Sequence, residues 1–89
     1  MSHPDQKIEV HVSFPISKHG PYNTAVTPET TVGAVLQAAM THFEVKDDSQ
    51  FTYVLAFDGL EQSSTVTIGS LAGDAHDVRF TLVKKITQG

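Results

Sequence analysis

The sequence contains no cysteine among its 89 residues. This absence excludes disulfide bonds, thiolate nucleophiles and zinc sites built from thiolates. Apolar runs are also short, and none approaches the roughly 18 residues that a membrane-spanning helix needs. Residues 1–6 contain no apolar signal region. We therefore expect a cytoplasmic protein that does not interact with membranes.

Charge is the second scarce property, since charged residues make up 18% of the chain and the net charge is −4. An acidic balance favours solubility and argues against general binding to nucleic acids. The length suits one small domain, and we see no internal repeat. We expect a monomer with a disordered segment at 1–6, a folded domain at 7–83 and a flexible tail at 84–89.

Two segments with strict alternation of apolar and polar residues lie near the two ends of the chain. The apolar positions are Ile8, Val10, Val12, Phe14 and Ile16 in the first segment and Val78, Phe80 and Leu82 in the second. A period of two is typical of a strand with one buried face. Further strands are predicted at 22–27, at 51–57 and, after the Asp58-Gly59 turn, at 60–62. The closing strand is expected from Asp77 to about Lys85, so that its end overlaps the tail.

One helix is predicted between the second and third strands. Its apolar stripe at helical period is Val32, Val35, Leu36, Ala39, Met40 and Phe43. Thr31 is the expected N-cap, and Thr67 is expected to cap a brief turn over 68–71. The order strand, strand, helix, strand, short strand, strand defines an α+β protein of the β-grasp type. The first and last strands should form the central pair of a mixed sheet, with the helix packed on one face.

With that order in place, residues 7 to 87 resemble ubiquitin and its relatives, including bacterial ubiquitin-like proteins. The resemblance rests on Thr31-Val32 at the helix start and on the segments 54–59, 67–71 and 78–82. It implies a protein modifier, not itself an enzyme and without a cofactor. Its C-terminal carboxylate would be activated by a partner enzyme and joined to target amines by an isopeptide bond. The implied partners are activating and conjugating enzymes and a deconjugating protease.

The resemblance assigns two groups of site residues. Thr87, Gln88 and Gly89 form the conjugation tail, in which Ile86-Thr87 stands where ubiquitin has paired glycines. Lys84, Lys85, Ala56 and Thr81 form the candidate partner-binding group. Ala56 and Thr81 match two positions of ubiquitin's apolar surface patch, and the third falls in the Lys18-His19 turn. Because that patch is weakened, we do not expect receptors of the ubiquitin type to bind.

Alternatives remain at several positions. Lys84-Lys85 is either a solvated strand end or an electrostatic handle for an acidic groove on a partner. The domain is alternatively an interaction module that binds through a sheet face or edge, using His11, Ala56, Thr81 and Val83, or a sulfur carrier with a terminal glycine. The five histidines show no ligand spacing, so no metal site is expected. Ser63, Ser64 and Ser70 have no evident base partner, so no intrinsic enzyme is expected.

Overall fold

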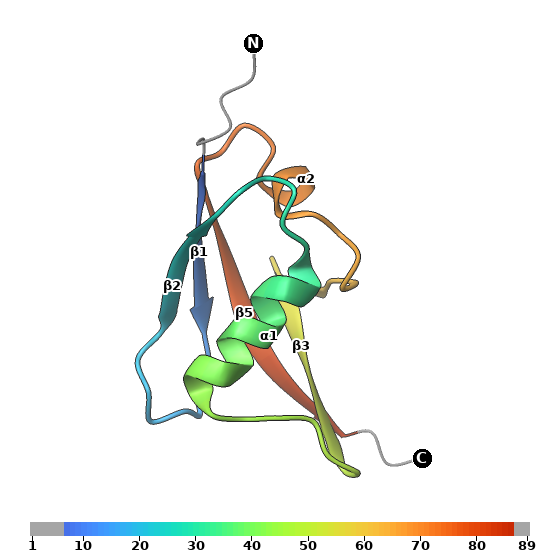
Figure 1. Ribbon diagram of the computed structural model, residues 1–89. Coiled ribbons are helices and arrows are strands. Elements are labelled where there is room, and N and C mark those ends of the chain that lie inside the picture. The colour runs from blue at the N-terminus through green and yellow to red at the C-terminus, as the bar shows by residue number, and fades with distance from the viewer. Residues whose placement is uncertain (1–6, 87–89) are drawn as a thin grey trace.

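The computed structural model describes residues 7–86, in which five strands and two helices follow one another (Figure 1). The elements are β1 (Ile8–Ser13), β2 (Tyr22–Val26), α1 (Val32–Phe43), β3 (Phe51–Phe57), β4 (Leu60–Glu61), α2 (Ile68–Ala72) and β5 (Asp77–Ile86). This order confirms the predicted one, with the short helix α2 at the place of the expected turn. Within the described residues, neither helix is long and apolar enough to cross a membrane.

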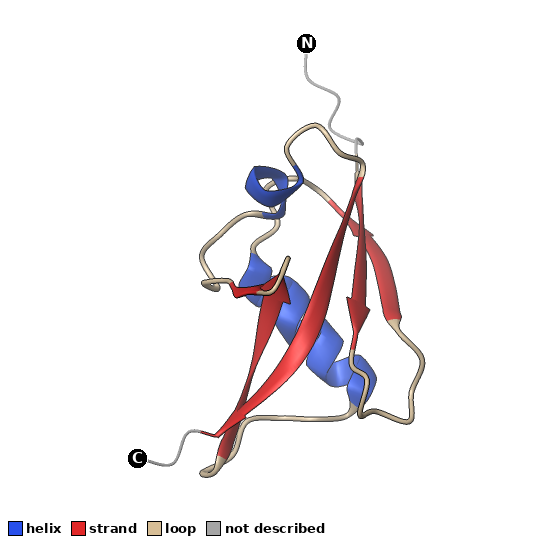
Figure 2. Cartoon of the chain, turned by 180° about the vertical axis from the view of Figure 1, so that it is seen from behind, coloured by secondary structure: helices blue, strands red, loops and turns tan. Residues whose placement is uncertain are grey.

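The strands form one mixed sheet in the order β2-β1-β5-β3-β4. The first and last strands, β1 and β5, are parallel neighbours, and the other adjacent pairs are antiparallel. The predicted central pair is therefore confirmed. Helix α1 lies across one face of the sheet, and the view from behind shows no helix over the other face (Figure 2). We call this uncovered side the open face; it carries the outward side chains of β1, β2, β3 and β5.

Helix α1 forms where the sequence predicts it because its capping and its apolar stripe agree. The Thr31 hydroxyl accepts a hydrogen bond from the Ala34 amide at 3.2 Å, which satisfies one of the free N–H groups at the helix start. The core lies between the inner face of α1 and the sheet. Its buried residues are Ile8, Val10, Val12, Phe14, Val32, Val35, Ala39, Met40, Phe43, Tyr53, Leu55, Ile68, Val78, Phe80 and Leu82.

The starts of the two helices are joined through their backbones. The Ile68 amide donates to the Thr30 carbonyl at 2.8 Å, and the Gly69 amide donates to the Pro28 carbonyl at 2.9 Å. In the reverse direction, the Val32 amide donates to the Val66 carbonyl at 2.7 Å. These bonds satisfy amides that a helix start otherwise leaves unpaired. They fix the connection between β4 and β5 against the start of α1.

Two boundaries differ from the sequence prediction. Ile16 is 71% exposed instead of lying in the core, because the strand ends at Ser13 and a turn follows, closed by the bond from the Ser17 amide to the Phe14 carbonyl. Strand β5 continues to Ile86, beyond the predicted domain boundary at 83. It does so because β3 offers partners along its whole length, with Phe51 opposite Ile86. Residues 84–86 therefore pair with β3 as part of the sheet.

The loop between α1 and β3 is organised by Asp48. Its carboxylate accepts hydrogen bonds from the Gln50 and Phe51 amides, both at 2.8 Å. These two bonds hold the pKa of Asp48 below its ordinary value, and the charge of Lys84 adds to the effect. A group whose pKa is lowered on folding stabilises the folded state above its unfolded pKa, and this contribution is lost as the pH falls through its folded pKa.

Asp48→Asn should therefore be less stable than the wild type at pH 7. The difference should shrink as the pH falls from about 4 through the lowered pKa of Asp48. Urea unfolding of both proteins from pH 7 to pH 2.5 measures this. A difference that is constant across the whole range would show that the carboxylate's charge contributes nothing to the loop.

Candidate functional site

The end of β5 is held in the sheet up to its last residue. Tyr53 lies opposite Lys84, Thr52 opposite Lys85 and Phe51 opposite Ile86 in the antiparallel pairing with β3. Ile86, the last residue that the structure describes, is 74% exposed. The predicted conjugation residues Thr87, Gln88 and Gly89 lie outside the described residues.

Lys84 and Lys85, the two residues before Ile86, have different environments. The Lys85 ammonium lies 2.7 Å from a carboxylate oxygen of Glu61 on β4. The Lys84 ammonium lies 4.1 Å from the centroid of the Phe51 ring, a cation–π arrangement. The ion pair of Lys85 is exposed, and such pairs contribute about 0–1 kcal/mol. Both lysines are exposed near the end of β5, on opposite faces of the sheet.

Ala56 and Thr81, predicted as partner-binding residues, are cross-strand partners on β3 and β5. Ser13 of β1 lies on the other side of Thr81, so three small side chains follow one another across the open face. They line a hollow of about 710 Å³ that also includes Asp58, Asp77 and Arg79. No large apolar side chain projects from this row, which agrees with the weakened patch expected from the sequence.

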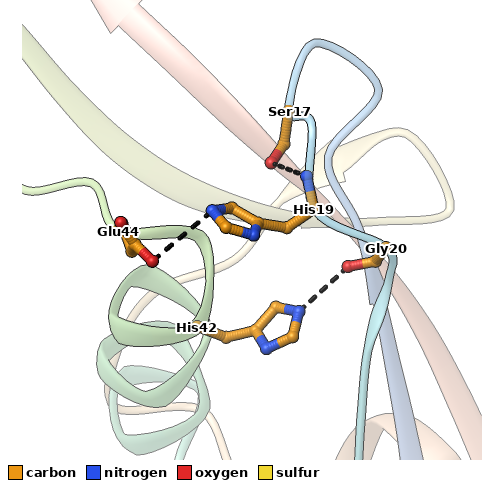
Figure 3. Close-up of polar contacts among 5 residues, drawn as sticks. All are labelled: Ser17, His19, Gly20, His42 and Glu44. Atoms are coloured by element: carbon orange, nitrogen blue, oxygen red, sulfur yellow. Dashed lines mark hydrogen bonds and ion pairs between the residues drawn. The ribbon is translucent and has the colours of Figure 1, made fainter.

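The Lys18-His19 turn contacts the end of α1, and His19 also lines a small hollow together with Ser13. As Figure 3 shows, His19 lies against the end of α1, with its ring nitrogen 3.6 Å from a Glu44 carboxylate oxygen. Glu44 has the left-handed conformation that ends α1, and its backbone places the carboxylate beside the turn. The role of the Lys18-His19 turn as the third patch position stays a prediction.

His42 makes a second link between the same turn and helix. Its ring nitrogen Nε2 lies 2.9 Å from the Gly20 carbonyl oxygen (Figure 3). The centroid of its ring lies 5.2 Å from that of Tyr22 and 4.8 Å from that of Phe43. The sequence places His42 off the apolar stripe but gives no sign of this contact, because the two partners are 22 residues apart. Within residues 7–86, no cluster of three or more histidine or acidic side chains could hold a metal ion.

Arg79 is a candidate binding residue that the sequence reasoning missed. It lies on β5 opposite His11 and lines two separate hollows of the open face. His11 is held by Asn23 at 2.7 Å and lies 3.7 Å from Glu9, whereas Arg79 forms no ion pair with any described residue. The signal was present, since Arg79 is the only arginine and the alternation of Val78, Phe80 and Leu82 turns it outward.

Comparison with known proteins identifies the fold. A ubiquitin from Caldiarchaeum subterraneum is 24% identical, covers 93% of this chain and 99% of its own, and superposes with a TM-score of 0.73. The C-terminal ubiquitin-like domain of human p59 OASL is 22% identical over 100% of this chain and 95% of its own, with a TM-score of 0.67. A structure described as "Molecular Mimicry of SUMO promotes DNA repair" is 15% identical over 91% of this chain and 95% of its own, with a TM-score of 0.68.

No protein-family model matches the sequence, and no curated protein sequence matches it. The structural likeness is nevertheless consistent along nearly the whole chain. The protein has the ubiquitin-like β-grasp fold. Identities below 25% establish the fold alone, because one fold carries many functions.

Proposed function

We propose that the protein is a ubiquitin-like modifier of a bacterial ubiquitin-like pathway. Its C-terminal carboxylate is activated by a partner enzyme and joined to amines of target proteins. The observation that supports this proposal is the path of β5. This strand lies inside the sheet and pairs with β3 up to Ile86, so the residue before the proposed tail is held by the sheet.

The chemistry requires little from the chain itself. A carboxylate oxygen of Gly89 attacks the α-phosphorus of ATP and pyrophosphate leaves. A thiol of the activating enzyme then displaces AMP and forms a thioester. A target amine displaces that thiol, which leaves an amide bond. Glycine has no side chain to obstruct a narrow enzyme channel, and the partner enzymes, with a deconjugating protease for reversal, supply every other group.

The test is to express the full chain with an N-terminal tag in its own cells and purify it under denaturing conditions. Mass spectrometry should find target lysines linked to the chain's C-terminus. Deletion of Gly89 should abolish these products, whereas Gly20→Ala should keep them, because a methyl group at Gly20 has no atom within 4 Å. Unchanged products after Gly89 deletion would refute conjugation through this residue. A C-terminal thiocarboxylate would assign sulfur transfer instead.

The alternative is an interaction module that uses the open face without conjugation. Arg79, which lines two hollows and forms no ion pair within residues 7–86, favours this reading. Removing residues 87–89 leaves every described β3–β5 pair in place, so this truncation separates the two functions. A binding partner that survives the truncation but is lost in Arg79→Ala would favour the module.

A further inference from the structure

A second surface of different chemistry lies at the end of the molecule where α1 ends. It is a hollow of about 330 Å³, which we call the terminal pocket. Its deepest side chains are Phe14, Phe43 and Tyr53, whose rings pack edge to face, with Phe14 centred 5.4 Å from Phe43 and 6.0 Å from Tyr53. Because all three belong to the core, the pocket has a rigid aromatic floor.

The rim of the terminal pocket combines an apolar residue with cations. Ile16 lines it and is 71% exposed, one of three large hydrophobic residues with high exposure in the described chain. Lys18 and Lys84 also line it, and neither forms an ion pair with a carboxylate of residues 7–86. The single lining carboxylate, Glu44, has His19 at 3.6 Å.

The rim of the terminal pocket has more positive than negative side chains, whereas the whole chain has a negative net charge. The protein has a net charge of −4, whereas the terminal pocket carries two lysines against one carboxylate that already has an imidazole beside it. The hollow on the open face instead contains Asp58 and Asp77 around Arg79. Charge complementarity therefore directs an acidic ligand to the terminal pocket and away from the open face.

The rim is also fixed in place by the histidine contacts of Figure 3. His42 bonds to the Gly20 carbonyl, and His19 lies beside Glu44. Together these contacts tie the turn that carries Ile16 and Lys18 to the end of α1. The other side of the rim, Lys84, belongs to β5 and lies two residues before Ile86, the last described residue.

We propose that the terminal pocket binds an acidic peptide segment with one apolar anchoring side chain. The anchor contacts Ile16 over the aromatic floor, and flanking carboxylates pair with Lys18 and Lys84. Because Lys84 lies close to the end of β5, the terminal pocket is suitably placed to bind a segment of the enzyme that activates the C-terminus. This identity of the partner rests on the proposed function, whereas the binding chemistry does not.

The experiment uses the full chain labelled with ¹⁵N and titrated with a blocked peptide of one leucine flanked by two glutamates on each side. We expect amide shifts confined to the pocket-lining segments 14–19 and 43–45 and Lys84, with a dissociation constant on the order of 1 mM. Binding should strengthen as salt is lowered, because exposed charges are less screened. A peptide with serine in place of leucine should bind at least about fivefold more weakly.

Matched variants separate the pocket from net charge. Lys18→Glu with Lys84→Glu should abolish the shifts, whereas Lys7→Glu with Thr65→Glu and Ala75→Glu, at exposed positions that do not line the pocket, changes the charge equally and should keep them. Ile16→Ser, at an exposed position, should weaken binding without unfolding, so the proposal stays testable if the double variant loses its fold. Absence of shifts, equal binding of the serine peptide, or equal loss in the matched variant would overturn the proposal. If the peptide binds but no conjugation product is found in cells, the proposal for the terminal pocket stands and the proposed modifier function is refuted.

Discussion

Leu55→Ala should lower the free energy of unfolding by about 3 kcal/mol. Leu55 lies in β3 opposite Leu82 of β5, and both side chains are at most 2% exposed. The truncation removes buried methyl groups and leaves a cavity that the surrounding strands fill only partly. A domain of this length has a total stability of roughly 5–10 kcal/mol. The loss should therefore lower the thermal midpoint by at least about 12 °C.

Leu60→Ala is the matched control for this change. It removes the same atoms from the neighbouring strand β4, but Leu60 is 69% exposed. Its effect should stay within about 0.5 kcal/mol, as for most exposed positions. Urea and thermal unfolding followed by circular dichroism measure both variants. Equal losses for the two leucines would contradict the placement of the core between α1 and the sheet.

The folded elements were predictable because their signals are local. Alternation along 8–14 and 78–82 and the helical stripe from Val32 to Phe43 specify which side chains are buried, and burial then fixes which elements pack together. The Asp58-Gly59 turn and the Thr31 cap add chemistry that acts over a few residues. Agreement between these local signals and the final packing is typical of sequences that fold to one structure.

The features that the sequence did not predict depend on contacts between distant segments. Ile16 continues the alternation, yet it leaves the core because the turn after Phe14 redirects the chain. Strand β5 extends one residue past its predicted end near Lys85 because Phe51 lies opposite Ile86. His19 and His42 meet only because the β1–β2 turn folds against the end of α1.

The candidate site likewise has one part that local sequence patterns predict and another that depends on contacts between distant segments. The alternation along β5 is sufficient to place Thr81 and Arg79 on the outward face, and the register with β3 then makes Ala56 the neighbour of Thr81. The terminal pocket combines residues from the segment after β1, the end of α1, β3 and β5, so no single stretch of the sequence predicts it. The positively charged rim of the terminal pocket can therefore be recognised only in the folded structure.

Gly69→Ala should destabilise the protein by about 1–3 kcal/mol, because the added methyl group has no room. It would lie 2.8 Å from the Pro28 Cβ atom, 3.0 Å from the Pro28 carbonyl oxygen and 3.2 Å from its Cα. Two of these atoms are backbone, so no side-chain rotation relieves the contact. The bond from the Gly69 amide to the same carbonyl, 2.9 Å long, would have to lengthen as well.

The competing effect is that alanine favours a helix over glycine by up to about 1 kcal/mol. It should not prevail at Gly69, because the displaced backbone also carries the link between the starts of α1 and α2. Gly20→Ala is the control, since nothing lies within 4 Å of a methyl group there, and its effect should stay within about 1 kcal/mol of zero. Thermal unfolding should show a midpoint at least about 5 °C lower for Gly69→Ala. An unchanged or higher midpoint would mean that α2 shifts away from Pro28 at no cost, and that the two helix starts are not held together as the hydrogen bonds indicate.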